Sequence, residues 1–395
     1  MYIERSLSSV VLQASKQFKA VTITGPRQSG KTTLARHLFP GYAYVSLENL
    51  DTRMRALNDP RGLLADYPAG SIIDEIQRAP ELLSYLQTVL DNSPETGQYI
   101  LTGSQNLVLS EAVSQTLVGR TSLHTLLPLT LHEIWQHDVS KSIEEVLSRG
   151  QYPALYGSND SSTINSALFY ESYVALYLER DLRDLRHITD LALFRDFMAL
   201  VAGRAGQQVN YTELAGVLGR DATTIKAWYA LLETSYIVFK LRPYSARLSR
   251  RLSKMPKYYF YDTGLLCHLL GIRSASEAEQ HYAWGQIFEN FVIAEKFKES
   301  TNIGKQPRFH FLRDKRGNEV DMVEEIPRGL RLTEIKAART FSKDMVKGLD
   351  SYQELDKQFP LEKQLIYRGE AMQYKDTLVT NMQTTNPPST PPHLP

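Results

Sequence analysis

Short apolar runs alternate with stretches whose apolar residues recur at helical spacing over residues 20–131. Each run has the length of a short strand, and apolar positions three or four residues apart follow it. This alternation is typical of an α/β domain with a mostly parallel sheet. The predicted strands are residues 21–24, 43–47, 71–73, 98–101 and 122–126.

The middle of the chain has a different pattern. Residues 141–200 predict a helical connector, because their apolar positions keep helical spacing. Helices are expected at 210–219 and 222–233, separated by a glycine turn, and a strand is expected at 236–241. This order predicts a winged helix-turn-helix in the middle of the chain, with boundaries at 201–275.

The C-terminal part again alternates helix and strand. An amphipathic helix at 284–296 opens a predicted α/β domain at 276–376. Residues 377–395 are polar and rich in proline and threonine, so we expect a disordered tail. The strands predicted in this domain are residues 309–312, 319–323 and 331–336.

Composition narrows the class of protein. The chain has 395 residues and a formal net charge of +1, so any attraction to nucleic acid must come from a local basic segment. Cys267 is the single cysteine, which excludes an intrachain disulfide framework and predicts a reducing, cytoplasmic location. No apolar run approaches the roughly 18–20 residues of a membrane span, so no membrane partner is expected.

The strongest chemical signal is a phosphate-binding loop between the strand at 21–24 and a helix-forming run at 33–38. Glycines allow the tight turn through which backbone N–H groups converge on phosphate. Lys31 would reach the β- and γ-phosphates, and the Thr32 hydroxyl would bind Mg²⁺. The residues expected to contact ATP are Gly25, Pro26, Arg27, Gln28, Ser29, Gly30, Lys31, Thr32 and Thr33.

Two acidic residues close the strand at 71–73. Asp74 is expected to hold Mg²⁺ directly or through water. Glu75 is the candidate general base for the attacking water, because a carboxylate beside the phosphates can accept its proton. The spacing from the phosphate-binding loop therefore predicts a site for ATP and Mg²⁺.

Two polar residues near the later strands are further candidates. The Ser104 hydroxyl would contact the γ-phosphate, and the alternative is an N-cap hydroxyl at a strand-to-helix turn. Arg120 is a candidate catalytic arginine finger, and the alternative is an ordinary surface charge. If Arg120 is a finger, we expect it to act on a neighbouring subunit's nucleotide, which implies a homo-oligomer.

These motifs resemble the AAA+-like bacterial and archaeal ATPases that are joined to the domain of unknown function 4143. The resemblance implies an AAA+-like P-loop ATPase domain at 1–140, with ATP binding and hydrolysis. Gln151 departs from the family pattern, because a second glycine is expected after Gly150. Beyond the P-loop the resemblance is carried by residues 127–133, 150–153, 177–181, 259–265, 319–321 and 334–336.

A basic segment at 240–257 is the candidate contact with DNA or RNA. The predicted second helix offers only Thr223, Thr224 and Lys226 as base readers, so little sequence preference is expected. The alternative is a basic loop that docks on acidic faces of the ATPase domain. The basic residues of the segment are Lys240, Arg242, Arg247, Arg250, Arg251, Lys254 and Lys257, interleaved with Tyr244 and Tyr258.

A second cluster of acidic residues and lysine lies in the C-terminal domain. Asp321 precedes Glu334 and Lys336 on the next predicted strand, and alternation places Glu334 and Lys336 on one face. Asp321 and Glu334 would hold a second Mg²⁺, with Glu289 as an additional carboxylate and Lys336 orienting water. This spacing resembles the PD-(D/E)XK nuclease fold and implies a restriction-endonuclease-like α/β domain.

Three functions follow from these patterns. The first is an ATP-driven switch that acts with nucleic acid through the winged helix and the nuclease-like domain. The second is a Mg²⁺-dependent nuclease gated by ATP. The third is an ATP-switched protein-binding scaffold that uses no nucleic acid.

Overall fold

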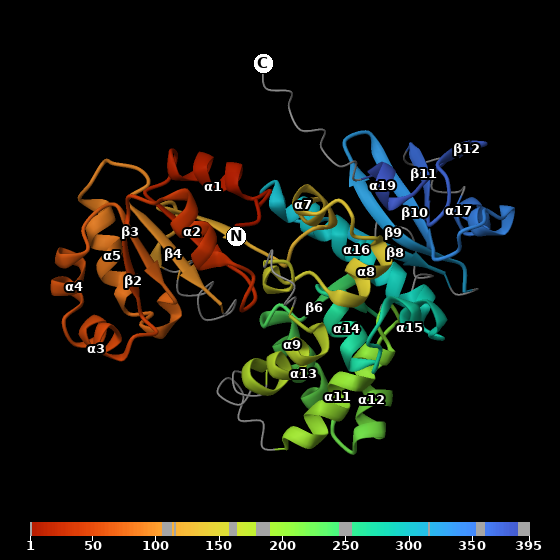
Figure 1. The fold of residues 1–395 in the computed structure, drawn as a ribbon, viewed down its shortest axis with the longest axis horizontal. Helices are drawn as coiled ribbons and strands as arrows, with labels where there is room; N and C mark the ends of the chain where they lie inside the picture. Colours follow the sequence, from red (N-terminus) through yellow and green to blue (C-terminus); the bar gives the residue numbers. More distant parts are fainter. Residues whose placement is uncertain are drawn as a thin grey trace.

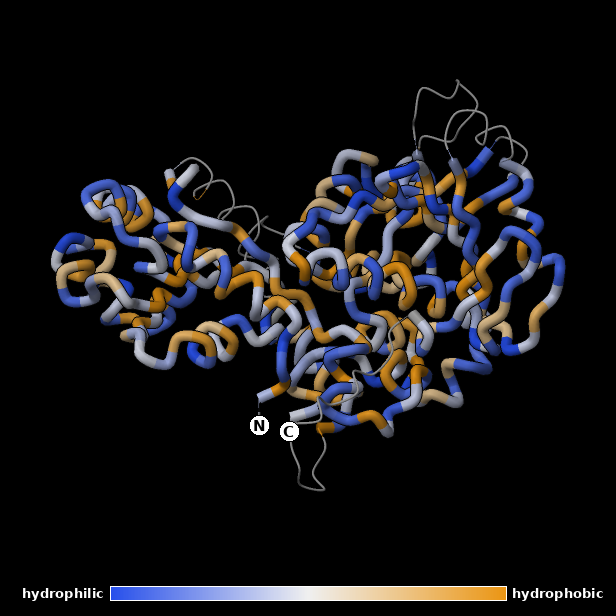
Figure 2. The backbone as a smooth tube through the Cα atoms, turned by 90° about the horizontal axis from the view of Figure 1, so that it is seen from above, coloured by the Kyte–Doolittle hydropathy of each residue, from blue (hydrophilic) through white to orange (hydrophobic). Residues whose placement is uncertain are grey.

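The fold is described from a computed structural model of the chain. Figure 1 shows two lobes, a smaller one coloured red to orange and a larger one formed by the rest of the chain. Figure 2 shows the same two lobes from a second direction. The described residues are 2–104, 113, 116–157, 164–178, 190–244, 255–314, 317–352 and 360–385.

The smaller lobe contains a five-stranded sheet in the order β2-β3-β4-β1-β5. All its strand pairs are parallel, so the predicted mostly parallel α/β domain is confirmed. The strands are β1 (Ala20–Thr24), β2 (Ala43–Ser46), β3 (Ser71–Asp74), β4 (Tyr99–Gly103) and β5 (Thr121–Thr125).

Two hydrophobic cores cover the two faces of this sheet. Ile72 and Ile100 belong to one core, whereas their neighbours Ile73 and Leu101 belong to the other, as strand alternation requires. Helices α1 and α2 contribute to the first core, and α3, α4 and α5 to the second. The helices are α1 (Ser8–Ser15), α2 (Lys31–Leu38), α3 (Leu50–Asn58), α4 (Pro60–Asp66), η1 (Ile76–Arg78) and α5 (Leu82–Asp91).

The helical part of the larger lobe begins immediately after β5. Helix α7 starts with a capping box in which Thr130 and Glu133 satisfy each other's backbone N–H groups. Helix α12 ends at Gly219, which has the left-handed backbone that a helix end favours. The elements are α7 (Leu131–His137), α8 (Ile143–Arg149), η2 (Pro153–Leu155), α9 (Ser166–Tyr173), η3 (Val174–Leu178), α11 (Leu191–Gly203), α12 (Tyr211–Leu218) and α13 (Ala222–Thr234).

An eight-stranded mixed sheet, in the order β12-β13-β11-β10-β9-β8-β6-β7, forms the other part of the larger lobe. Helix α16 packs against β7 and β10. The elements are β6 (Val238–Pro243), β7 (Lys257–Phe260), α14 (Thr263–Leu269), α15 (Ala275–Gln280), α16 (Trp284–Asn302), β8 (Phe309–Arg313), β9 (Glu319–Ile326), β10 (Gly329–Lys336), η4 (Lys343–Val346), α17 (Lys347–Asp350), β11 (Leu361–Tyr367), β12 (Met372–Tyr374), β13 (Thr377–Thr380) and α19 (Met382–Thr385).

The segment predicted to be a winged helix is joined to the C-terminal sheet. Strands β6 and β7 pair as a hairpin, but β6 also pairs in parallel with β8 through Arg242 and His310. One hydrophobic core reaches from Ile3 to Met382 and includes residues of both segments. The two predicted units therefore share a sheet and a core.

The predicted disordered tail begins too early in the chain. Strand β13 lies within the predicted tail and pairs with β11 and β12. Its residues Thr377, Val379 and Thr380 are buried in the sheet. Residues 386–395, which carry all the prolines of this segment, lie outside the described residues. In the described part of the chain, no helix is long and apolar enough to cross a membrane.

Candidate active site

The phosphate-binding loop follows β1 at the carboxyl end of the parallel sheet. Gly25 has a φ of +144° and Gly30 a φ of +94°, angles that other residues rarely adopt. A Cβ atom at Gly25 would lie 2.1 Å from the carbonyl oxygen of Leu126, so a larger residue does not fit. Gly30 is the N-cap of α2. The loop and the helix N-terminus thus form the arrangement that phosphate binding requires.

The Lys31 side chain is buried and folded onto the loop. Its Nζ donates to the carbonyl oxygens of Pro26 at 2.8 Å and Gly25 at 3.0 Å. Burial lowers the pKa of Lys31 to about 8, and the carboxylates of Glu75 and Asp74 oppose this effect. Phosphate groups would also favour the charged ammonium, so nucleotide binding is compatible with this position.

Asp74 lies at the end of β3 and contacts the Thr32 hydroxyl. Thr32 Oγ1 donates to both carboxylate oxygens of Asp74 at 3.0 Å. Tyr44 donates to Asp74 Oδ2 at 2.7 Å, and Thr102 donates to Oδ1. The two residues predicted to hold Mg²⁺ from separate parts of the sequence are therefore adjacent, and their oxygen atoms are the ligands that Mg²⁺ prefers.

Glu75 directly follows β3 and has a left-handed backbone, with a φ of +57°. Such a conformation costs about 1–3 kcal/mol in a residue other than glycine, and it is typical of functional sites. Ser104 Oγ donates to Glu75 Oε2 at 3.1 Å, and Gln77 donates to the same oxygen. Ser104 therefore lies beside the candidate general base. Its predicted contact with the γ-phosphate stays a prediction.

The remaining loop residues differ in their surroundings. Gln28 has a φ of +62°, and Arg27 Nη1 lies 3.8 Å from Glu48 Oε1. The Ser29 carbonyl oxygen accepts a hydrogen bond from Arg5 Nη1. Thr33 lines a cavity of about 480 Å³ together with Thr32, Arg36, Phe39, Pro40, Tyr42, Tyr44 and Ile72.

Arg120 lies at the opposite edge of the sheet from the loop. It precedes β5, whose residue Thr121 pairs with Ala20 at the amino end of β1. Four strand steps, about 13 Å, separate this edge from the loop. Arg120 Nη2 donates to Asp91 Oδ2 at 2.8 Å. This position excludes a role as a finger at this chain's own nucleotide, and a role at a neighbouring subunit stays a prediction.

Residues that the sequence patterns did not indicate also belong to the site. Tyr44 reaches Asp74 because β2 and β3 are neighbours, with Ser46 paired to Asp74. Gln77 belongs to η1 and donates to Ser104 Oγ at 3.1 Å. Both lie near recognised motifs in the sequence, but strand order and the turn after β3 decide their contacts.

The predicted carboxylate cluster of the larger lobe combines residues from α16, β9 and β10. Lys336 pairs with Glu334, and its Nζ lies 3.9 Å from Asp321 Oδ2. Glu289 accepts a hydrogen bond from Tyr259 at 2.6 Å and lies 3.3 Å from Lys257 Nζ. Burial raises the pKa of Glu289 to about 7 and that of Glu334 to about 8.

The second Mg²⁺ site at Glu289, Asp321 and Glu334 stays a prediction. Among the described residues, no three His, Cys, Asp or Glu side chains are already arranged to hold a metal ion. The charges of two of these carboxylates are compensated within the chain, because Lys257 pairs with Glu289 and Lys336 pairs with Glu334. One atom of the cluster, the buried Glu334 Oε2, has no hydrogen-bond partner there.

The basic segment is only partly available for nucleic acid. Lys257 is 1% exposed and pairs with Glu289 and Glu319, so its prediction as a phosphate contact is wrong. Lys240 pairs with Glu233 at 2.9 Å, whereas Arg242 is exposed. Four of the predicted basic residues lie outside the described residues: Arg247, Arg250, Arg251 and Lys254.

Three families match successive parts of the chain. Residues 17–135 match the AAA domain, and residues 140–276 match the domain of unknown function DUF8612. Residues 284–385 match the domain of unknown function DUF4143. The AAA match contains the phosphate-binding loop together with Asp74 and Glu75.

Similar proteins occur in several bacteria. Uncharacterized proteins of Mycobacterium tuberculosis and Mycobacterium bovis are each 31% identical over 302 residues, which is 74% of this chain. The match spans 66% of each mycobacterial protein, just under two thirds of its length. A Haemophilus influenzae protein is 25% identical over 335 residues, covering 74% of this chain and 80% of its own length.

Solved structures of two archaeal proteins show a distant likeness. A Walker-type ATPase of Pyrococcus abyssi is 14% identical with a TM-score of 0.44, over 68% of this chain and 96% of its own. A STAND protein of Pyrococcus horikoshii is 14% identical with a TM-score of 0.28. The match covers 74% of this chain and 45% of the Pyrococcus horikoshii chain. These values are too low to bear on function. The predicted resemblance to an AAA domain joined to DUF4143 is confirmed by the order of the family matches, with the AAA match at 17–135 and the DUF4143 match at 284–385.

Proposed function

We propose that this chain binds ATP with Mg²⁺ and hydrolyses the β–γ phosphate bond. The observation that carries the proposal is the contact of Thr32 with Asp74 at 3.0 Å beside the phosphate-binding loop. Thr32 lies in the first turn of α2, which follows β1, and Asp74 ends β3, so both side chains are at the carboxyl edge of the parallel sheet. That convergence suits a metal ion bound to a nucleotide phosphate.

Each residue of the site has a distinct task in this mechanism. The loop amides and Lys31 bind the phosphate oxygens. Thr32 and Asp74 hold the Mg²⁺, which when bound neutralises phosphate charge. Glu75 accepts the proton of the attacking water, and Ser104 and Gln77 orient its carboxylate through the hydrogen bonds they donate.

The test is a steady-state ATPase assay of the full chain and of Lys31→Ala and Glu75→Gln. Both variants are expected to lose turnover, whereas Glu75→Gln keeps ATP binding because the loop is unchanged. Glu81→Gln, an exposed glutamate of the same lobe, is the matched control. Wild-type turnover in Glu75→Gln would show that another group is the base.

A second candidate function is Mg²⁺-dependent cleavage of a nucleic-acid backbone by the carboxylate cluster of the larger lobe. The observation that favours it is the buried, unpartnered Glu334 Oε2 beside Lys336. Asp321 and Glu334 would hold the ion, but only if it displaced Lys336 from its ion pair with Glu334. Incubation of plasmid DNA and of RNA with Mg²⁺ tests this, with Asp321→Asn and Lys336→Ala as inactive variants. Glu324→Gln, a glutamate of the same strand that pairs with Arg331, is the control.

The wider role that we propose is an ATP-driven switch in the cytoplasm that acts with nucleic acid. Support comes from the exposed Arg242 and the basic residues that follow it in the sequence. ATPase rates with and without DNA test the role, together with salt-dependent DNA binding by wild type and by a chain with Arg250 and Arg251 neutralised. Hydrolysis and binding indifferent to DNA would favour the scaffold that uses no nucleic acid.

A further inference from the structure

Arg5 is a buried arginine whose side chain connects the phosphate-binding loop to the segment after β5. It is 4% exposed and precedes α1. Its Nη1 donates to the Ser29 carbonyl oxygen at 2.7 Å, and its Nη2 donates to the Leu127 carbonyl oxygen at 2.7 Å. A single guanidinium therefore holds two segments that are far apart in the sequence.

The bond to Ser29 bears directly on the phosphate-binding geometry. In a trans peptide the C=O and N–H groups point in opposite directions. Because Arg5 holds the Ser29 carbonyl from one side, the N–H of Gly30 is turned to the other side of the loop. Gly30 is the N-cap of α2, so this N–H belongs to the group of amides that faces phosphate.

The charge of Arg5 is compensated by Glu133 of α7. Arg5 Nε lies 3.2 Å from Glu133 Oε1, and both side chains are almost fully buried. Glu133 also accepts from the backbone N–H of Thr130 at 2.8 Å and of Ser6 at 2.7 Å. Glu133 Oε1 also accepts a hydrogen bond at 3.5 Å from Nδ2 of Asn302, the last residue of α16. A guanidinium is suited to this place because it donates in several directions at once.

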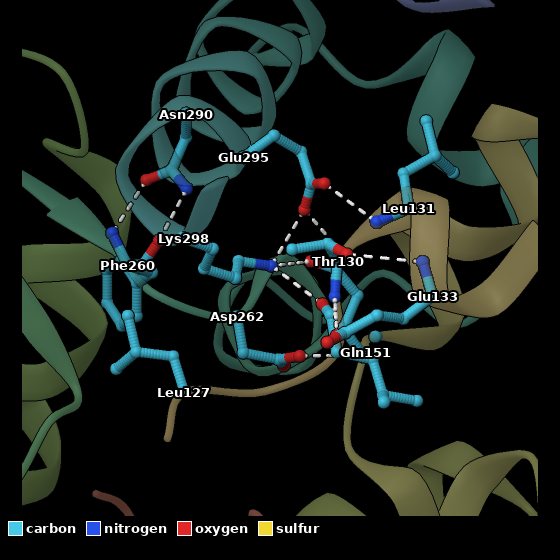
Figure 3. Close-up of polar contacts among 12 residues, drawn as sticks. Leu127, Thr130, Leu131, Glu133, Gln151, Phe260, Asp262, Asn290, Glu295 and Lys298 are labelled. Atoms are coloured by element: carbon cyan, nitrogen blue, oxygen red, sulfur yellow. Dashed lines mark hydrogen bonds and ion pairs between the residues drawn. The ribbon is translucent and has the colours of Figure 1, made fainter. Parts of the chain in front are cut away.

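Helix α16 holds the same segment at a second point, shown in Figure 3. Glu295 accepts from the backbone N–H of Leu131 at 2.7 Å, and Lys298 donates to the Leu129 carbonyl oxygen at 3.1 Å. Gln151 completes this buried cluster with hydrogen bonds to Glu295 and Lys298, both at 2.6 Å. Gln151, the residue that departs from the family pattern, is thus a central member of the contact between α16 and the segment after β5.

We propose that Arg5 is a positioning residue for ATP binding that also transmits the state of the phosphate-binding loop, through Glu133, to α7 and α16. The inference rests on the proposed ATPase function. It assigns to the N-terminal segment a task in the nucleotide site, although Arg5 itself does not touch the reacting atoms. Helix α16 carries Glu289 near its other end, so the same path leads toward the carboxylate cluster.

The first test compares the kinetics of full-length wild type, Arg5→Lys and Arg149→Lys with ATP and Mg²⁺. Lysine keeps the charge but cannot span both carbonyl groups, so the KM for ATP should rise about tenfold while kcat changes much less. Arg149→Lys is the matched control, because Arg149 donates to the Leu155 carbonyl oxygen at 2.8 Å and not to a carbonyl of the loop. It should keep the wild-type KM.

The second test measures hydrogen exchange of the backbone amides of residues 130–137 with and without ATP. Wild type should gain protection there, and Arg5→Lys and Glu133→Gln should not gain it even at saturating ATP. Wild-type KM and protection in Arg5→Lys would overturn the proposal. If that variant does not fold, full protection in Glu133→Gln would overturn it. Failure of wild type to bind ATP would instead reject the proposed ATPase function, and this role with it.

Discussion

The ATP site and the carboxylate cluster of the larger lobe use the same residue types in opposite ways. In the ATP site, Lys31 donates to carbonyl groups and Asp74 accepts from hydroxyl groups, so lysine and carboxylate do not pair with each other. In the carboxylate cluster, Lys336 and Lys257 pair directly with Glu334 and Glu289.

This difference shows that a motif of acidic residues and lysine indicates a metal or phosphate site only when it is known whether the lysine pairs with the carboxylates. The ATP site has hydroxyl and carboxylate oxygens ready for a cation, and a lysine ready for phosphate. In the cluster the chain supplies its own cations, so a metal ion must compete with two ion pairs. Four predictions sharpen or break this contrast.

The largest effect is expected for Glu75→Gln. Loss of a general base typically costs about 10²–10⁴-fold in turnover, so ATP hydrolysis should fall within that range. Affinity for ATP should stay within about threefold, since no loop contact is removed. Steady-state turnover and equilibrium binding of ATP measure the two effects. A parallel loss of binding would mean that Glu75 supports the loop instead of the water.

The next effect is expected for Lys257→Met, which leaves Glu289 buried without its main cation. Removing one partner of a buried ion pair costs about 3–5 kcal/mol, and Tyr259 offsets part of this because it still donates to Glu289. Chemical denaturation at pH 8 measures the loss of unfolding free energy. The double variant Lys257→Met/Glu289→Gln should recover much of it. No loss in the single variant would show that the pair is not needed to compensate charge.

The pH dependence of this loss has a defined sign. The pKa of Glu289 is raised to about 7 in the folded chain from an ordinary 4.5, so the folded state binds the proton more tightly. The stability from that proton is complete below pH 4.5 and is lost as pH rises through 7. Lys257→Met should therefore be less destabilising at pH 5 than at pH 8, because Glu289 is protonated and neutral at pH 5.

A smaller effect is expected for Tyr44→Phe. The variant removes the hydrogen bond to Asp74 at 2.7 Å and keeps the ring. A single hydrogen bond to a charged group contributes about 1.5–3 kcal/mol, and Thr32 and Thr102 still donate to Asp74, so we expect the lower end of that range. The predicted result is a higher Mg²⁺ requirement for hydrolysis, measured by Mg²⁺ titration at saturating ATP. Tyr42→Phe, from the same cavity, is the control, and an equal shift in both would remove the specific role of Tyr44.

The smallest effect is expected for Arg120→Ala. Its pair with Asp91 is at the surface, where solvent screens the charges, so the thermal midpoint should not change measurably. Turnover should also be unchanged, because the position excludes this chain's own nucleotide site. Turnover that rises with protein concentration in wild type but not in Arg120→Ala would instead support action on a neighbouring subunit.

Local patterns in the sequence were sufficient to predict the fold class and the phosphate-binding loop of the smaller lobe. Glycine, lysine and threonine spacing, with a strand before and a helix after, predicts the loop, and Asp74 and Glu75 follow an apolar run that is indeed β3. Such signals are local because the backbone geometry they need spans only a few residues. Tyr44 and Gln77 carried no comparable signal, since their contacts depend on strand order.

The C-terminal half shows where local patterns fail. Strand β13 was predicted to belong to a disordered tail because residues 377–395 are polar and rich in proline and threonine, yet β13 pairs with β11, and Thr377, Val379 and Thr380 are buried. Lys257 was predicted to contact phosphate because it belongs to the basic segment at 240–257. In the folded chain it pairs instead with Glu289 and Glu319. The free energy of a buried charge depends on partners from other elements, and spacing along the chain does not contain them.

The amino-acid sequence alone was enough to predict the phosphate-binding loop and the fold class of the smaller lobe, because those depend on backbone turns and alternation within short segments. Only the folded chain showed that Arg5 reaches Ser29, that Lys257 is buried and that Gln151 bonds to Glu295 of α16. Each of these contacts joins residues that are distant in the chain, and packing of complete elements brings them together.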